Sequence, residues 1–151
     1  FVIGKLIEGN EDLIKRQKEE GHIIGNHTYN HVDITRMSDA DAMEEIRRTN
    51  EAVKKVTGDD VMFVRPPFGV WQKKLESELN VLPVMWSVDP LDWTTENTDE
   101  IVNKVVTKVK ENDIIFLHDC YQSSVDAAFR IIDILKKQGY EFVTVDEMIL
   151  N

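Results

Sequence analysis

The chain has 151 residues, of which 42% are hydrophobic, so it is long enough to form one domain with a buried core. It contains no apolar run near the ~18 residues that a membrane-spanning helix needs. The net charge of −10 argues against nucleic acid as a partner, because phosphate binding needs clustered lysine and arginine. The single cysteine, Cys120, excludes an internal disulfide framework and leaves the cellular compartment open.

Helical patterns recur along the chain and are bounded by recognisable caps. The first spans residues 11–20 and stops at Gly21, and the second begins after Ser38 as N-cap and ends at Gly58. The charged residues from Glu44 to Lys55 are expected to form an ordinary solvated face of this second helix. Further helices are predicted over 73–80, over 100–111 with Thr98 or Asp99 as cap, over 124–138, and as a short terminal turn.

Short apolar runs alternate with these helices. They predict strands over residues 1–3, 22–26, 61–64, 81–88, 113–117 and 141–145. Nearly continuous apolar strands that alternate with helices are typical of a parallel sheet covered by helices, either a barrel or a doubly wound sheet. No internal repeat or domain boundary is visible.

Polar residues follow four of these strands. The segment HTYNH (residues 27–31) follows the second strand, RPPFG (65–69) the third, DPLDW (89–93) the fourth, and HD (118–119) the fifth. Each has a simpler explanation, as a solvated loop, a proline-stiffened turn or a helix cap. Because the carboxyl ends of parallel strands share one face, where active sites form, four such segments together favour a functional site on that rim.

These segments resemble the motifs of the polysaccharide deacetylase family, the NodB-homology domain of carbohydrate esterase family 4. GHIIGNHTYNH resembles the family's metal-binding motif, RPPFG its arginine–proline motif, DPLDW its Asp-Trp motif, and FLHD its Leu-x-His motif. The likeness extends from Phe1 to Leu150. It implies one domain over residues 1–151 with a distorted parallel (β/α) barrel of the NodB type, lacking its first strand in this chain.

The resemblance also implies a chemistry, the metal-dependent removal of acetyl groups from an N-acetylated polysaccharide. His27 and His31 would bind a divalent metal, most simply zinc, with cobalt, nickel or manganese as alternatives. His118 would act as the general acid, and Asp92 would orient it. Arg65 would position a catalytic aspartate. The backbone N–H of Phe68 would bind the oxyanion, while Trp93, Phe116 and Leu117 would line the acetyl pocket.

Three departures from the family pattern stand out. Phe68 replaces a tyrosine, and Phe116 replaces a leucine. The family's first motif, Thr-Phe-Asp-Asp-Gly, which carries the catalytic base and an aspartate ligand, is absent. We expect the chain to be a fragment of a longer deacetylase, inactive without that segment. The alternative is that Asp33, Asp89 or Asp119 substitutes, although none is a persuasive ligand.

Two other functions remain open from the sequence. One is a non-catalytic carbohydrate-binding or structural domain of the same fold, and the other is a different metal-dependent amidohydrolase on a barrel. For a deacetylase, the expected substrate is N-acetylglucosamine of peptidoglycan. Chitin oligomers, a poly-N-acetylglucosamine exopolysaccharide and acetyl-xylan are alternatives. A wall polymer as substrate implies an extracellular or cell-surface location. The sequence predicts no oligomeric state. Cys120 is expected to be a small, half-buried residue.

Overall fold

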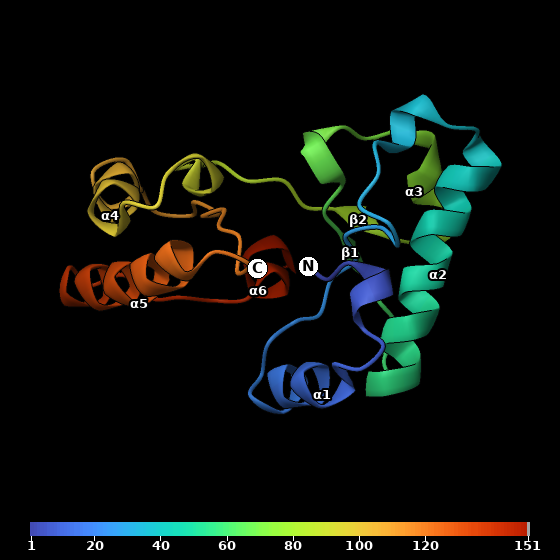
Figure 1. Cartoon of the computed structure of the whole chain (residues 1–151), viewed down its shortest axis with the longest axis horizontal. Coiled ribbons are helices and arrows are strands. Elements are labelled where there is room, and N and C mark those ends of the chain that lie inside the picture. Colours follow the sequence, from blue (N-terminus) through green and yellow to red (C-terminus); the bar gives the residue numbers. More distant parts are fainter. Residues whose placement is uncertain (151) are drawn as a thin grey trace. The chain divides into compact units, whose positions relative to one another are not determined.

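The computed structural model describes residues 1–150, with side chains through residue 149, and Asn151 of the predicted domain lies outside the described residues. The chain folds as two compact units, Phe1–Met85 and Trp86–Asn151, and each is described by itself. Figure 1 labels their helices and strands. In the described part of the chain, no helix is long and apolar enough to cross a membrane.

The first unit contains three helices and a small parallel sheet. The helices are α1 (Glu11–Glu19), α2 (Asp39–Thr57) and α3 (Lys74–Leu79), the strands are β1 (Phe63–Val64) and β2 (Leu82–Pro83), and three short 3-10 turns cover Gly4–Leu6, Ile34–Arg36 and Pro67–Gly69. These helices lie where the sequence predicts them.

Parallel pairing in this unit follows the order of the chain. Val2 pairs with Asn26, Asn26 pairs with Val64, and β1 pairs with β2, all in parallel. The ladders are shorter than the apolar runs predict. Pro83 contributes to this, because proline has no N–H to donate to a ladder. The parallel order is the one expected for consecutive strand–helix units.

Helix α2 has the predicted ends. The Ser38 hydroxyl accepts a hydrogen bond from the N–H of Asp41 at 3.2 Å, and Gly58 ends the helix with a φ of 80°. A left-handed residue after a helix suits glycine, which has no Cβ to clash. The buried face of α2 contributes to two apolar clusters of the first unit. One contains Ile34, Ala42, Ile46, Val64, Leu75 and Val81, and the other contains Ile7, Val53 and Val61.

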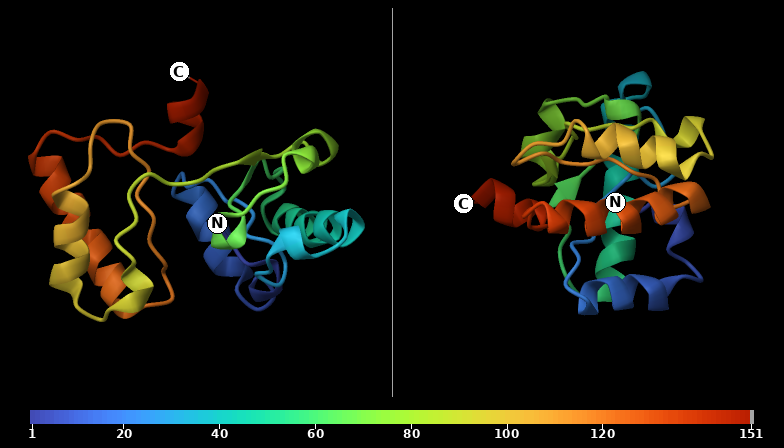
Figure 2. Two further views of the ribbon diagram at one scale, coloured as in Figure 1. Left: turned by 90° about the horizontal axis from the view of Figure 1, so that it is seen from above. Right: turned by 90° about the vertical axis from the view of Figure 1, so that its left-hand side faces the viewer.

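The second unit is built around two helices that pack side by side, as both views of Figure 2 show. These are α4 (Thr98–Val106) and α5 (Gln122–Lys137), and they are accompanied by α6 (Val145–Leu150) and a 3-10 turn at Asp92–Thr94. Val88 and Ile115 form a parallel bridge. The core consists of Val88, Ile101, Val102, Val105, Ala127, Ile131 and Leu135.

Two predictions for this unit were wrong in detail. Helix α4 is capped by Asn97, whose Oδ1 accepts from the N–H of Glu100 at 3.2 Å, rather than by Thr98 or Asp99, and it ends at Val106. Residues 141–145 do not form a strand. Thr144 instead bonds to Glu147, whose carboxylate accepts from the Thr144 N–H and hydroxyl at 2.8 Å each. The bond from the Thr144 N–H to the Glu147 carboxylate is one half of a capping box and favours the start of helix α6 there.

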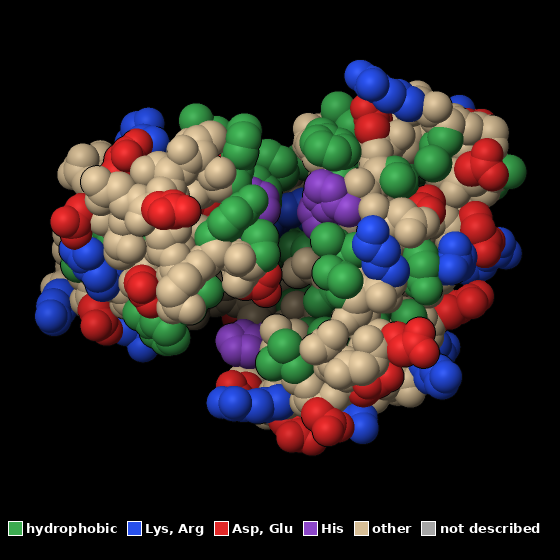
Figure 3. All heavy atoms as spheres, in the orientation of Figure 1, with side chains coloured by type: hydrophobic (Ala, Val, Ile, Leu, Met, Phe, Trp, Pro, Cys, Tyr) green, Lys and Arg blue, Asp and Glu red, His purple; other side chains and the backbone are tan. Residues whose placement is uncertain are grey.

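Charged side chains are spread over the face drawn in Figure 3, with acidic and basic groups intermixed in each unit. Nine of the ion pairs in the described residues join lysine or arginine to aspartate or glutamate on solvent-accessible side chains, as between Arg130 and Asp99. Exposed pairs of this kind contribute about 0–1 kcal/mol each.

Candidate functional site

The two histidines of HTYNH lie side by side in the first unit. The segment directly follows Asn26, which pairs with Val2 and Val64, and the N–H of His27 donates to the carbonyl of Val2 at 2.9 Å. The imidazole rings of His27 and His31 are 4.8 Å apart, centre to centre, and meet edge to face. The sequence spacing alone does not require this proximity. It depends on left-handed backbone conformations at Thr28 and His31, with φ values of 59° and 60°.

His27 is held in the form that a metal ligand requires. Its Nδ1 lies 2.6 Å from the carbonyl oxygen of Arg65. A carbonyl can only accept, so Nδ1 carries the proton and the lone pair is on Nε2. Burial is the main cause that lowers the pKa of His27 to about 4, so the imidazole is neutral at neutral pH. A neutral ring whose second nitrogen bonds to a backbone carbonyl is the usual state of a histidine that binds a metal.

No further ligand group accompanies this pair in the part of the chain that the structure describes. These residues contain no cluster of three or more histidine, cysteine, aspartate or glutamate side chains that could hold a metal ion. The Asp33 carboxylate accepts from the N–H of Thr35 at 3.0 Å, Asp89 accepts from the N–H of Leu91 at 2.8 Å, and Asp119 is exposed. The pair His27–His31 therefore fits a divalent metal that prefers imidazole, as a partial ligand set.

The segment RPPFG flanks this pair. Arg65 is largely buried, and its guanidinium donates to the carbonyls of Val84 at 3.1 Å and Met85 at 3.2 Å. Burial lowers its pKa to about 10, which still leaves it charged at neutral pH. Phe68 has a left-handed φ of 61° and a side chain that is 67% exposed, and its ring lies 5.2 Å from that of His31.

In the second unit, Asp92 and His118 are joined by two hydrogen bonds. Asp92 is completely buried, and its Oδ2 accepts from the backbone N–H of His118 at 2.7 Å. Its Oδ1 lies 2.8 Å from Nδ1 of the same residue. Nδ1 thus donates to the carboxylate, and Nε2 is the nitrogen that can exchange a proton with another molecule. The two hydrogen bonds fix the orientation of the imidazole ring.

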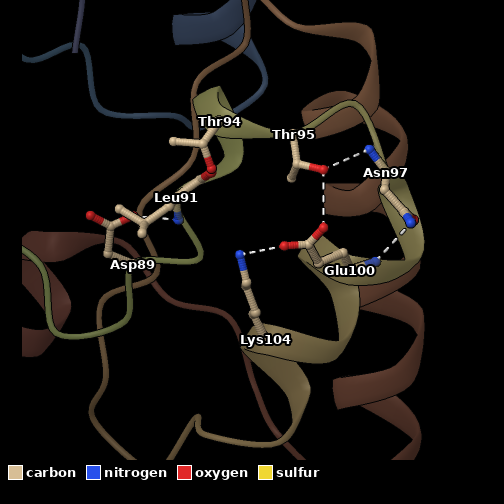
Figure 4. Close-up of polar contacts among 7 residues, drawn as sticks. All are labelled: Asp89, Leu91, Thr94, Thr95, Asn97, Glu100 and Lys104. Carbon is tan, nitrogen blue, oxygen red and sulfur yellow. Dashed lines mark hydrogen bonds and ion pairs between the residues drawn. The ribbon is translucent and has the colours of Figure 1, made fainter.

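The loop that carries Asp92 is shaped by its own side chains, as Figure 4 shows. The Asp89 carboxylate accepts from the N–H of Leu91 at 2.8 Å, and Leu91 has a left-handed φ of 56°. The hydroxyl of Thr94 donates to the carbonyl of Leu91 at 2.7 Å. Farther along, Glu100 accepts from the Thr95 hydroxyl at 3.1 Å and pairs with Lys104 at 2.7 Å. These bonds link the loop directly to helix α4.

The other predicted pocket residues of this unit are aromatic or apolar. Trp93, next to Asp92, is 55% exposed. Phe116 stacks on Trp86 with ring centres 4.0 Å apart, and its ring meets that of His118 at 4.5 Å. Leu117 is half-buried against the core. The ring of His118 therefore sits in an aromatic environment.

Near His118, the prediction for Cys120 was wrong, and one aromatic neighbour was not predicted. Cys120 is exposed and not half-buried as expected, because it lies in the turn that precedes α5. Tyr121, which the sequence did not single out, places its ring 6.3 Å from that of His118.

The solvated face predicted for Glu44–Lys55 was wrong at Glu45. This carboxylate is only 9% exposed and accepts from both the N–H and the side-chain amide of Asn30, at 2.7 and 2.6 Å. A signal was present in the sequence. Glu45 lies three residues after Ala42 and one before Ile46, which places it on the apolar face of the helix.

Known proteins resemble this chain over most of its length. The profile described as polysaccharide deacetylase matches residues 1–85. The peptidoglycan-N-acetylmuramic acid deacetylase PdaC of Bacillus subtilis is 35% identical over 98% of the chain. The peptidoglycan-N-acetylglucosamine deacetylase PgdA of Listeria monocytogenes is 34% identical over 98% of it. The chain spans about a third of each, 32% of both lengths.

Solved structures of proteins from the same family also resemble this chain. The structure of PdaC from Bacillus subtilis matches with a TM-score of 0.94 and 35% identity, over 98% of this chain and 73% of that one. A mutant of BA3943, described as a CE4 family pseudoenzyme with restored enzymatic activity, matches with a TM-score of 0.88 and 26% identity, over 96% and 54% of the two chains. This likeness confirms the predicted fold class.

Proposed function

Because the chain belongs to the polysaccharide deacetylase family, we propose that it carries the metal-ligand histidines and the acid histidine of a metal-dependent N-deacetylase. The observation that carries this proposal is the Asp92–His118 pair, with both carboxylate oxygens directed at one histidine. A fully buried carboxylate is costly to maintain unless its partners stabilise it. A pair of this kind fits a residue that must accept and release a proton.

His27 and His31 are the side chains that would hold the metal. When bound, a divalent metal supplies a nucleophilic water at neutral pH and polarises the acetyl carbonyl. The chain's own contribution is to keep His27 neutral through burial and to fix its tautomer through the carbonyl of Arg65. Zinc suits two imidazoles best, with cobalt, nickel or manganese as alternatives.

His118 supplies the proton that the departing sugar amine needs. Amines leave poorly unless they are protonated as the C–N bond breaks, and an imidazolium is a suitable acid near neutral pH. Asp92 holds the ring by Nδ1, so that Nε2 delivers the proton. The backbone N–H of Phe68 would stabilise the oxyanion that develops from the acetyl carbonyl. Trp93, Phe116 and Leu117 would contact the acetyl methyl group, and Arg65 would position an aspartate.

The proposed substrate is peptidoglycan, with N-acetylglucosamine as the sugar attacked. This rests on the two relatives named for peptidoglycan deacetylation, one acting on N-acetylmuramic acid and the other on N-acetylglucosamine. A wall polymer as substrate places the proposed enzyme outside the cytoplasm or at the cell surface. Chitin-like oligomers offer the same amide and are the second substrate class to test.

The chain by itself is proposed to be incomplete as a catalyst. The described residues place no third ligand beside His27 and His31, and a catalytic zinc site needs three protein ligands. The test measures acetate release from peptidoglycan and from chitin oligomers, with zinc or cobalt added. We expect metal binding without efficient turnover, and turnover that appears when a peptide containing Thr-Phe-Asp-Asp-Gly is supplied. Full turnover by the chain alone would contradict its incompleteness.

The second candidate is a non-catalytic carbohydrate-binding or structural domain. Two observations bear on it: the partial ligand set, and the likeness to wild-type BA3943 of Bacillus anthracis, described as a CE4 family pseudoenzyme, at 25% identity. The same experiment separates the two functions. Oligosaccharide binding without metal uptake, and without turnover when the peptide is added, would support the non-catalytic function. A His118→Ala variant that abolishes the restored turnover would support the enzyme.

A further inference from the structure

The loop that carries His27 and His31 has a backbone that is unfavourable for its residues. Thr28 and His31 both adopt left-handed φ values, 59° and 60°. This region disfavours side chains with a Cβ, and β-branched threonine most of all. Thr28 is moreover completely buried. Conformations of this kind persist only where the surroundings impose them.

Helix α2 contacts the loop through Glu45. Both oxygens of its buried carboxylate accept from Asn30, one from the backbone N–H at 2.7 Å and one from the side-chain Nδ2 at 2.6 Å. Asn30 directly precedes the left-handed His31. The two bonds fix the direction of the peptide that enters His31.

Helix α2 also contacts the loop through Asn26, near the other left-handed position. The buried Nδ2 of Asn26 donates to the carbonyl of Ile46 at 2.8 Å and to Oδ1 of Asn50 at 2.7 Å. Its Oδ1 accepts from the N–H of Thr28 at 2.7 Å. The side-chain amide of Asn26 thus connects the two elements: its Nδ2 donates to helix α2, and its Oδ1 accepts from the loop.

The backbone before α1 completes the support. The N–H groups of Gly4 and Lys5 donate to the carbonyls of Thr28 and Tyr29, each at 3.0 Å. The hydroxyl of Thr28 in turn accepts from the N–H of Val32 at 3.2 Å. Hydrogen bonds from three directions therefore surround the strained residues, and none of them involves an imidazole.

We propose that helix α2 sets the geometry of the histidine pair, with Glu45, Asn30 and Asn26 as positioning residues that bring the rings of His27 and His31 together. The inference rests on the proposed function in that these histidines are taken to bind the metal. Residues that orient metal ligands typically change metal affinity about 10–100-fold when they are replaced. Glu45 lies on the helix and Asn26 is bonded to it, so the site's shape is built into the fold before any metal binds.

The test uses Asn30→Ala, which removes one bond to Glu45 from an exposed side chain and leaves the core intact. Asn10→Ala is the matched control, because Asn10 also gives a single side-chain bond, from Nδ2 to the carbonyl of Leu6 at 2.9 Å, away from the loop. Glu45→Gln is the conservative variant, since its amide oxygen can still accept one of the two bonds. All three are compared with the unaltered chain by cobalt titration and by NMR of the metal-free protein.

We expect Asn30→Ala to weaken cobalt binding about 10-fold, Glu45→Gln to weaken it less, and Asn10→Ala to leave it within about twofold. In the metal-free chain, Asn30→Ala should weaken the nuclear Overhauser effect between the two rings and speed amide exchange at Val32. Unchanged ring contacts and exchange in Asn30→Ala would overturn the proposal. If the unaltered chain binds no cobalt, the proposed metal function fails, and the metal-free measurements still decide the role of α2.

Discussion

The buried carboxylate of Asp92 accepts two hydrogen bonds from one residue, the backbone N–H and the Nδ1–H of His118. The pair joins the turn before α4 to the segment before α5, 26 positions apart. Because one carboxylate fixes both the backbone and the ring, loss of its charge should affect stability and imidazole orientation together.

The substitution Asp92→Asn tests this relationship. An amide can accept only one of the two bonds, so we expect the free energy of unfolding to fall by about 1–3 kcal/mol. We also expect the proton of the neutral His118 ring to redistribute between Nδ1 and Nε2, which ¹⁵N chemical shifts measure. Asp126→Asn, at a more accessible position on α5 that accepts from Gln122 at 2.8 Å, is the control. Equal stability losses in both variants would show that the pair has no special role.

Removal of the His27 ring should remove metal binding. We expect His27→Ala to weaken zinc or cobalt affinity at least about 100-fold, since a first ligand contributes more than the residues that orient it. His22→Ala is the matched histidine control, because His22 is exposed and lies outside the histidine loop. Metal content measured after purification and dialysis checks the prediction. Equal metal content in the two variants would rule out His27 as a ligand.

The pH dependence of stability should report the burial of His27. Its pKa in the folded, metal-free chain is lowered to about 4, from the ordinary 6.5. Between these values the unfolded chain binds the proton and the folded chain does not, so stability should rise with pH through this window. The contribution is fully present above pH 6.5 and is lost as the pH falls toward 4.

Urea unfolding of the metal-free chain at about pH 4.5 and about pH 6.5 measures this effect. Carboxylates also titrate near the lower pH, so the informative quantity is the difference between the chain and His27→Gln. We expect the variant to show a smaller rise in unfolding free energy, while His22→Gln keeps the full rise. An identical pH dependence in all three proteins would mean that His27 titrates normally.

Local sequence signals predicted much of the fold. Ser38 and Gly58 bound α2 as their capping chemistry requires, and polar residues after apolar runs marked both the His27–His31 pair and the Asp92–His118 pair. These features depend on neighbours in sequence or on the regular geometry of parallel strands. Short-range patterns are therefore sufficient to find them.

Features that depend on distant partners were missed. Residues 141–145 have the composition of a strand, but a strand needs backbone partners, and the capping bonds of Thr144 and Glu147 prevail there. The helical periodicity of α2 places Glu45 on the apolar face, but its partner, Asn30, lies 15 positions earlier in a loop and could not be predicted. The local sequence does not predict which loop will pack against a given face of a helix.

Gly4 supports the histidine loop at close range. A Cβ at this position would lie 2.4 Å from Oγ1 of Thr49 and 2.6 Å from Cδ2 of Tyr29. We expect Gly4→Ala to lower the free energy of unfolding by about 1–3 kcal/mol through this overlap. Because the N–H of Gly4 donates to the carbonyl of Thr28, the variant should also shift the amide resonances of residues 28–31.

Gly9→Ala provides the comparison. Gly9 has a φ of 82°, and a Cβ added there would meet no atom within 4 Å, so alanine costs only backbone strain, about 1–2 kcal/mol. Both variants therefore lose stability, but only Gly4→Ala should disturb the loop and weaken cobalt binding. If Gly9→Ala moved the loop resonances as far as Gly4→Ala does, the shifts would reflect general destabilisation, and the close packing of Gly4 against Tyr29 and Thr49 would not control the histidine loop.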